Sequence, residues 1–201
     1  MKTKIISFYA DLTRSTYYSD SAKKLKETCI NLNIDNDIIM LESRGSYMLN
    51  CLAKPKFIKD MMAKYNCPLI WMDCDTTLKE PFTIFDDIIE DIGFATHTGC
   101  ISGIKASPIF FNNTSNFTLI IDEWIFACEE GLRCNQIELD HDAIKHVVLP
   151  KIHKDISIFL IKENYNDYCN GKYIENGNSK LQEKYEIHRK ISKLNNTRKS
   201  L

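Results

Sequence analysis

The sequence predicts an α/β protein with a single Rossmann-like domain and a mostly parallel central sheet. Within the first 75 residues, three short apolar segments typical of strands alternate with two segments of helical periodicity. Strands separated by helices pair in parallel through right-handed crossovers, and the helices then cover both faces of the sheet. The 201 residues suffice for one buried core, and no shift in composition marks a second one.

Local patterns define each of these elements. In the first helix, Ala22, Leu25 and Cys29 recur at a spacing that places them on one face. The second helix has Pro55 in its first turn, where proline is tolerated because its missing N–H has no helical partner. The expected strands are residues 4–10, 37–43 and 67–75, and the expected helices are residues 19–32 and 54–65.

The second half of the chain continues this pattern. A long helix is expected to be capped by Thr114 or Ser115, with Trp124 in the core because it is at helical spacing from other apolar residues. Two strands should precede this helix and a shorter helix should follow it. The strands are DIGFATH at 91–97 and SPIFFNN at 107–113, and the helices are residues 114–130 and 138–148.

The C-terminal segment differs from the rest of the chain. Residues 1–170 are expected to form the folded domain, whereas residues 171–201 are polar and lysine-rich with little apolar periodicity. We expect this segment to complete the active site or to be partly irregular. Its positive charge would also suit peripheral contact with an anionic membrane.

Composition narrows the functional classes. The formal net charge is −1, so a nucleic acid is not expected as a partner. The N-terminal apolar run is too short for a signal peptide or a membrane span, and we therefore expect a cytoplasmic protein. The eight cysteines include no Cys-x-x-Cys pair, which favours free thiols over a zinc site or a disulfide framework.

Polar and aromatic residues follow the first three expected strands. In parallel sheets, ligands bind at the carboxyl ends of the strands, so these residues should meet in one site. The strand ends therefore predict a site formed by Phe8, Tyr9, Ala10, Asp11, Arg44, Asp73, Cys74 and Asp75.

The motif WMDCDTT supports three interpretations. Asp73 and Asp75 could hold Mg²⁺ or Mn²⁺, hard cations that neutralise the diphosphate of a sugar nucleotide when it leaves. The same letters fit the Asp-x-Asp-x-Thr signature of haloacid-dehalogenase-like phosphatases, in which Asp73 would be the nucleophile. The pair could also be a solvated turn after a strand. We favour the metal because two strand-helix units precede the motif, whereas the phosphatase domain normally begins at this strand.

The order of motifs resembles the small GT-A glycosyltransferases, in particular the glycogenin and lipopolysaccharide galactosyltransferase group. The resemblance spans about residues 4–168 and rests mainly on Asp-x-Asp and on DHDAI at residues 140–144, which is similar to the Asp-Gln-Asp-Ala-Leu string of that group. It implies a GT-A fold, a nucleotide-binding role for Phe8 to Ala10, and metal contact by the aspartate pair. It also implies catalytic roles for Asp140, His141 and Asp142 and a third metal ligand at His188.

These observations predict an enzyme that transfers a sugar from a UDP-sugar or GDP-sugar to a hydroxyl of a glycan, lipid-linked or protein acceptor. If the enzyme inverts the anomeric centre, Asp140 or Asp142 is the better candidate for the base; a retaining enzyme needs no dedicated base. Two alternatives stay open. They are the phosphatase with Asp73 as nucleophile and a protein that binds nucleotide sugars without turnover.

Overall fold

The computed structural model describes residues 3–12, 15–81, 83–136, 139–162, 165–168 and 171–177. Its centre is a six-stranded sheet in the order β2-β1-β3-β6-β5-β7, and β6 runs antiparallel to both of its neighbours while the other pairs are parallel. The predicted mostly parallel α/β fold is confirmed. The strands are β1 Lys4–Tyr9, β2 Asn36–Met40, β3 Leu69–Trp71, β5 Ile92–Thr96, β6 Ile104–Phe111 and β7 Ile158–Ile161.

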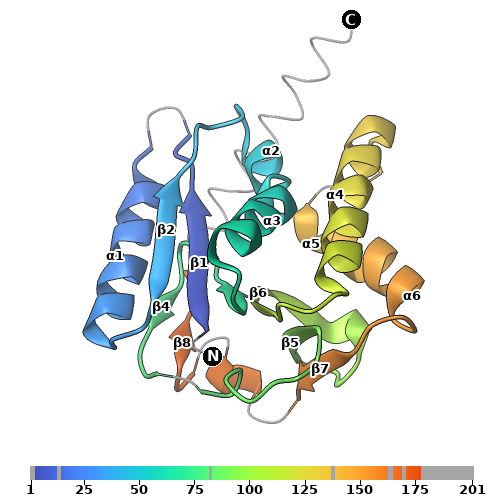
Figure 1. The fold of residues 1–201 in the computed structure, drawn as a ribbon. Coiled ribbons are helices and arrows are strands. Elements are labelled where there is room, and N and C mark those ends of the chain that lie inside the picture. The colour runs from blue at the N-terminus through green and yellow to red at the C-terminus, as the bar shows by residue number, and fades with distance from the viewer. Residues whose placement is uncertain are drawn as a thin grey trace, which may run out of the picture.

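Helices cover both faces of this sheet. Figure 1 shows α1 on one side of strands β1 and β2, and α3 and α4 on the other. The helical elements are α1 Tyr17–Asn31, α2 Tyr47–Cys51, α3 Lys54–Tyr65, α4 Phe117–Cys134, α5 Asp140–Ala143, η2 Ile144–Val148 and α6 Leu149–Ile152, with short 3₁₀ turns η1 Ile101–Gly103 and η3 Tyr165–Tyr168.

Two apolar clusters bury the two faces. Neighbouring residues of one strand point to opposite faces, so Ile6 and Phe111 join the α3–α4 side while Ile5 and Phe110 join the α1 side. Trp124 is fully buried in the α3–α4 cluster, as its helical spacing predicts. Among the described residues, no helix is long and apolar enough to cross a bilayer.

The strand directions determine where a ligand site can form. β1, β2 and β3 run in parallel, and the two antiparallel pairings of β6 bring β5 and β7 back to the same direction. The carboxyl ends of these five strands therefore lie at one edge of the sheet, where α/β proteins bind ligands. A second, two-stranded sheet pairs β4, Thr77–Leu78, with β8, Ile174–Glu175.

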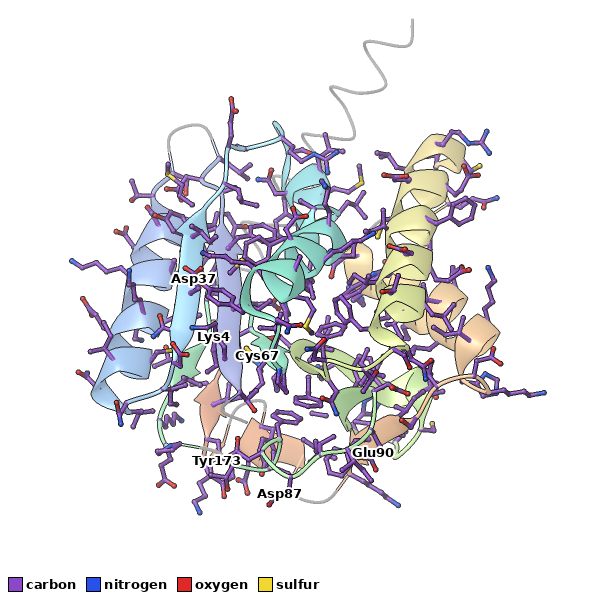
Figure 2. The ribbon with its side chains drawn as sticks, viewed as in Figure 1. Lys4, Asp37, Cys67, Asp87, Glu90 and Tyr173 are labelled. Carbon is purple, nitrogen blue, oxygen red and sulfur yellow. The ribbon has the colours of Figure 1, made fainter. Side chains whose placement is uncertain are left out.

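The amino-terminal edge of the sheet contains a compact set of paired charges. Figure 2 labels Lys4 and Asp37 on neighbouring strands β1 and β2. Lys4 Nζ lies 2.6 Å from Asp35 Oδ1, and Lys64 Nζ lies 2.9 Å from Asp37 Oδ2. The Tyr65 hydroxyl also donates to Asp37 Oδ2, at 2.5 Å, and Lys4 Nζ lies 4.3 Å from the Tyr65 ring centroid.

The structure corrects the predicted start of the long helix. α4 begins at Phe117 with Asn116 as its N-cap, so the prediction that Thr114 or Ser115 caps it is wrong. Thr114 lies three residues before Phe117, and its hydroxyl makes a tertiary contact by donating to the Asp91 carboxylate at 2.5 Å. The predicted strand at 37–43 also ends early, at Met40. The predicted short helix at 138–148 continues to Ile152 as α5, a π-helical turn and α6.

The first residues of the predicted C-terminal segment belong to the folded core. β8 hydrogen-bonds with β4, and Ile174 is fully buried. We call residues 171–177 the C-terminal strap. Residues 178–201 lie outside the described part of the chain, so the prediction for them stays a prediction.

Candidate active site

A pocket opens at the carboxyl edge of the sheet, where the sequence predicted a site. Strand β1 contributes its end, and the loop after β3 contributes the Asp-x-Asp pair. Residues of α2 and the first residues of α3 and α5 complete most of the lining. The lining consists of Phe8, Tyr9, Ala10, Tyr18, Tyr47, Asn50, Cys51, Lys54, Trp71, Asp73, Cys74, Asp75, Ala106, Leu139, Asp140 and His141.

Asp73 is held in place from three sides. Its Oδ1 atom accepts a hydrogen bond from Trp71 Nε1 at 3.0 Å and another from Lys54 Nζ at 3.2 Å. Its backbone N–H donates to Ser107 Oγ on β6 at 2.9 Å. The first carboxylate of the pair therefore has a fixed position at the end of β3, which a solvated turn would not require.

Asp75 lies deeper and is electrostatically strained. Burial and the nearby negative charge of Asp73 raise the pKa of Asp75 to about 6, although a hydrogen bond from the Tyr17 hydroxyl opposes the rise. Tyr17 Oη lies 3.4 Å from Asp75 Oδ2, so this bond is long. A cation beside Asp75 would relieve this strain.

A buried ion pair between Lys54 and Asp140 lies directly beside Asp73. Lys54 and Asp140 are only 5% and 3% exposed, and Lys54 Nζ lies 2.6 Å from Asp140 Oδ2. Burial disfavours the ammonium charge, but the carboxylates of Asp140 and Asp73 outweigh this and raise the pKa of Lys54. The ammonium group also lies 4.9 Å from the Trp71 ring centroid, a cation–π distance. Lys54 thus stays charged and links the two acidic parts of the pocket.

The pocket has more negative than positive charge. Among the described residues that line the pocket, Asp73, Asp75 and Asp140 face one ammonium group, that of Lys54, which leaves two negative charges when all three carboxylates are ionised. Within the described residues, no cluster of three or more His, Cys, Asp or Glu side chains could hold a metal ion by itself. The donor set fits Mg²⁺ or Mn²⁺ chemically, since these ions combine one or two carboxylates with phosphate oxygens and water.

His141 and Asp142 of DHDAI are more exposed than Asp140. His141 lines the pocket, and its Nε2 atom lies 3.2 Å from Asp142 Oδ1. The His141 and Asp142 side chains are 43% and 35% exposed, whereas that of Asp140 is 5% exposed. His141 and Asp142 are therefore accessible to an incoming molecule, and Asp140 is enclosed with Lys54.

The residues predicted to bind the sugar-nucleotide donor separate into two groups. Phe8, Tyr9, Ala10 and Cys74 line the pocket with the aspartate pair. Asp11 instead accepts hydrogen bonds from two backbone N–H groups at the start of α1, both at 3.0 Å, so its carboxylate caps that helix. Donor contact by Asp11 stays a prediction.

Of the two remaining predicted residues, one lines a different hollow and the other falls outside the described residues. Arg44 lines a second hollow between α3 and α4, where its Nη1 atom donates to Leu49 O at 3.3 Å. The Arg44 backbone N–H donates to Asn50 Oδ1 at 2.7 Å, so the loop after β2 still contacts a residue of the first pocket. His188 lies outside the described residues. Donor binding by Arg44 and metal binding by His188 both stay predictions.

Sequence reasoning missed Lys54 as a site residue, although a local signal was present. Lys54 is the first residue of α3, and the first turn of this helix contains no acidic residue. A lysine at this position opposes the helix dipole, which favours negative charge at the N-terminus. Such a lysine indicates carboxylates nearby in space, and here they are Asp73 and Asp140. Tyr18, Tyr47, Asn50 and Cys51 were also missed and carried no comparable signal.

Solved structures with the same fold are glycosyltransferases. One is a glycosyltransferase involved in the glycosylation of the major capsid of PBCV-1, with a TM-score of 0.66 and 15% identity over 93% of this chain and 100% of that one. The chain has a glycosyltransferase fold. Two others are structures of the glycosyltransferase GlyE of Streptococcus pneumoniae TIGR4, with TM-scores of 0.51 and, for the apo form, 0.53, at 15% and 12% identity.

Each GlyE match covers 82% of this chain but only 46% of GlyE, so the chain spans about half the length of that protein. No family model matches the chain, and no curated protein does. At these identities the likeness shows the fold. Membership of the glycogenin-like group and metal binding by the Asp-x-Asp pair stay predictions.

Proposed function

We propose that this protein is a metal-dependent glycosyltransferase. It transfers a sugar from a nucleoside diphosphate sugar, with UDP-sugars favoured, to a hydroxyl of a glycan, lipid-linked or protein acceptor. The observation that carries the proposal is the acidic excess of the pocket at the carboxyl edge of a glycosyltransferase fold. A diphosphate is itself anionic, so it can enter this pocket only together with a cation.

Asp73 and Asp75 would hold Mn²⁺ or Mg²⁺, which supplies Lewis-acid neutralisation of the leaving diphosphate when bound. Tyr9, Tyr18 and Tyr47 supply aromatic surface to the pocket, and such surface suits the flat nucleobase of the donor. Lys54 keeps Asp73 and Asp140 in fixed positions, so the site needs little rearrangement when a donor arrives.

The residues on the exposed side of the pocket are the ones that an acceptor hydroxyl can reach. Asp140 is a poor base, because its carboxylate is enclosed and paired with Lys54. If the reaction inverts the anomeric centre, the His141–Asp142 pair is the accessible group that can receive the acceptor proton. A retaining reaction would use these residues only to position the acceptor. Separation of the product anomers distinguishes these two cases.

The phosphatase is the alternative with a specific observation in its favour. Lys54 Nζ lies 3.2 Å from Asp73, and a lysine beside the nucleophile is expected for that class. However, β6 runs antiparallel beside the strand that carries Asp73, and the solved structures with this fold are glycosyltransferases. Fluoroberyllate mimics an aspartyl phosphate, so stabilisation by fluoroberyllate with Mg²⁺ would favour the phosphatase.

The proposal is tested by thermal unfolding in the presence of UDP, GDP, CMP and their sugar conjugates, each with Mn²⁺ or with EDTA. A ligand that binds only the folded state raises the melting temperature by mass action. We expect stabilisation by UDP or a UDP-sugar in Mn²⁺ and none in EDTA. Asp75→Asn is the matched variant and should fold but lose this shift. A shift of equal size in EDTA would rule out the metal role.

Binding without turnover is the remaining alternative, and hydrolysis of the stabilising sugar nucleotide separates it from an enzyme. We expect slow release of free sugar without acceptor, because water can replace the acceptor hydroxyl. Complete absence of hydrolysis over days, with binding intact, would favour a binding protein.

A further inference from the structure

The last described residue of the chain lies directly against the second carboxylate of the Asp-x-Asp pair. A Cβ atom built on Gly177 would lie 2.4 Å from Asp75 Oδ2, 2.8 Å from Asp75 Cγ and 2.9 Å from Tyr17 Oη. Non-bonded heavy atoms attract best at about 3.5–4.0 Å, so these separations are strongly repulsive. Any residue other than glycine would therefore displace Asp75, Tyr17 or the C-terminal strap.

The C-terminal strap cannot easily move away from Asp75. β8 pairs with β4, which begins two residues after Asp75, in the register Thr77↔Glu175 and Leu78↔Ile174. Next to Asp75 itself, the Thr76 hydroxyl donates to Asn176 Oδ1 at 3.2 Å. Further along, the Lys79 backbone N–H donates to Tyr173 O at 2.9 Å. Because these bonds hold both sides together, the spacing between Gly177 and Asp75 is a fixed feature of the fold.

The opposite side of Asp75 is held from the N-terminal part of the chain. Tyr17 is the first residue of α1, and its hydroxyl lies 3.4 Å from Asp75 Oδ2. The start of α1 is fixed in turn by the Asp11 carboxylate, which accepts hydrogen bonds from the backbone N–H groups of Tyr18 and Ser19. Asp75 thus lies between the hydroxyl of Tyr17, near the start of the described chain, and the backbone of Gly177, at its end.

We propose that Tyr17 and Gly177 form a clamp that holds Asp75 in the orientation in which it receives a divalent cation. The hydroxyl of Tyr17 directs one carboxylate oxygen, and the missing side chain of Gly177 leaves the space that this oxygen occupies. The inference rests on the proposed function, because the cation is the one that would accompany the donor diphosphate. Tyr17 and Gly177 are positioning residues that act through Asp75.

The test measures Mn²⁺ affinity directly, through the electron paramagnetic resonance signal of free Mn²⁺, with saturating UDP present and a protein-free UDP sample as the blank, because phosphate oxygens complete the metal's ligands. Gly177→Ala should weaken Mn²⁺ binding at least tenfold, because the new methyl group occupies the space of the carboxylate. Tyr17→Phe removes only the hydroxyl and should weaken binding about threefold. Glu175→Ala is the matched control, because this exposed residue lies on the same strap and its side chain pairs with Lys79 at the surface.

Circular dichroism and the melting temperature without metal separate lost affinity from lost folding. Tyr17→Phe tests the clamp without adding any atom, so the proposal stays testable if Gly177→Ala loosens the strap. Wild-type Mn²⁺ affinity in both variants would overturn the clamp and leave the proposed function intact. Absence of Mn²⁺ binding by the wild-type protein would overturn both.

Discussion

The two edges of the central sheet handle charge in opposite ways. At the amino-terminal edge, Lys4 and Lys64 pair with Asp35 and Asp37, and hydrogen bonds from Thr114, Asn116 and Ser157 satisfy the buried carboxylate of Asp91. At the carboxyl edge, one lysine faces three carboxylates of the pocket. Charges that already have partners need no further ligand and stabilise the fold. The excess carboxylates of the pocket, in contrast, would be neutralised by a bound cation. The comparison indicates which edge is built for a ligand.

The largest expected effect comes from removing Lys54, the lysine among the described residues of the pocket at the carboxyl edge. Lys54→Met leaves the enclosed Asp140 carboxylate without its partner, and breaking a buried pair in this way costs about 3–5 kcal/mol of folding free energy. Urea unfolding monitored by circular dichroism measures the loss. The double variant Lys54→Met/Asp140→Asn should recover most of it, because the remaining group is neutral. If the single and double variants were equally unstable, packing rather than charge would explain the loss.

A large effect is also expected at the amino-terminal edge, at Asp91 just before β5. Its carboxylate accepts hydrogen bonds from the Thr114 hydroxyl, the Asn116 amide, and the backbone and hydroxyl of Ser157. Asp91→Ala leaves these donors unsatisfied and should cost about 2–4 kcal/mol. Mn²⁺ affinity should not change, because Asp91 lies at the edge opposite the pocket. Weakened Mn²⁺ binding at a temperature where the variant is folded would contradict the separation of the two edges.

The contribution of Asp91 to the free energy of folding depends on pH through the pKa of its carboxyl group. Burial favours the neutral carboxyl, but the hydrogen bonds from Ser157, Thr114 and Asn116 outweigh it and lower the pKa below 3.8. A lowered pKa in the folded state means that the stabilisation is present above the unfolded value and is lost as the pH falls through the folded value. The stability difference between the wild-type protein and Asp91→Ala should therefore shrink only below about pH 4.

An effect of opposite sign is expected at Asp75. Burial and Asp73 raise its pKa from 3.8 to about 6, so the folded state binds this proton more tightly than the unfolded state does. The tighter proton binding of Asp75 in the folded state therefore stabilises the protein fully below the pKa of the unfolded state, and this stabilisation is lost as the pH rises through about 6. At pH 7 without metal, Asp75→Asn should therefore be about 1–2 kcal/mol more stable than the wild-type protein. Thermal unfolding in EDTA between pH 4 and pH 7.5 measures this gain.

The gain in stability should be accompanied by a loss of function. Asp75→Asn should lose Mn²⁺-dependent stabilisation by nucleotide, since a neutral amide is a weaker ligand for a hard cation. A protein that becomes more stable when a pocket carboxylate is neutralised keeps that carboxylate for a ligand rather than for the fold. A variant that is less stable than the wild-type protein at pH 7 would show that Asp75 supports the fold instead.

The same contrast explains what could be predicted from the sequence. Strands β1 and β3 were predictable because local apolar patterns define them, although β3 ends at Trp71 and not at residue 75 as predicted. Parallel pairing then required their carboxyl ends to meet. Lys54 was missed because its carboxylate partner Asp140 lies far away in sequence and meets it only through the fold. The α4 cap was predicted wrongly because local sequence does not show the tertiary contact in which the Thr114 hydroxyl donates to Asp91, a residue distant in sequence.

The smallest expected effect sharpens the comparison at the amino-terminal edge. Tyr65→Phe removes the hydroxyl that donates to Asp37 Oδ2 but leaves the ring beside Lys4. One hydrogen bond to a partly exposed carboxylate contributes about 0.5–1.5 kcal/mol, so the midpoint of urea unfolding should fall slightly. Mn²⁺ affinity and nucleotide-dependent stabilisation should equal those of the wild-type protein. Because Asp37 keeps its contact with Lys64, this edge loses one bond and remains balanced; a loss above about 3 kcal/mol would show that its charges act as one cooperative network.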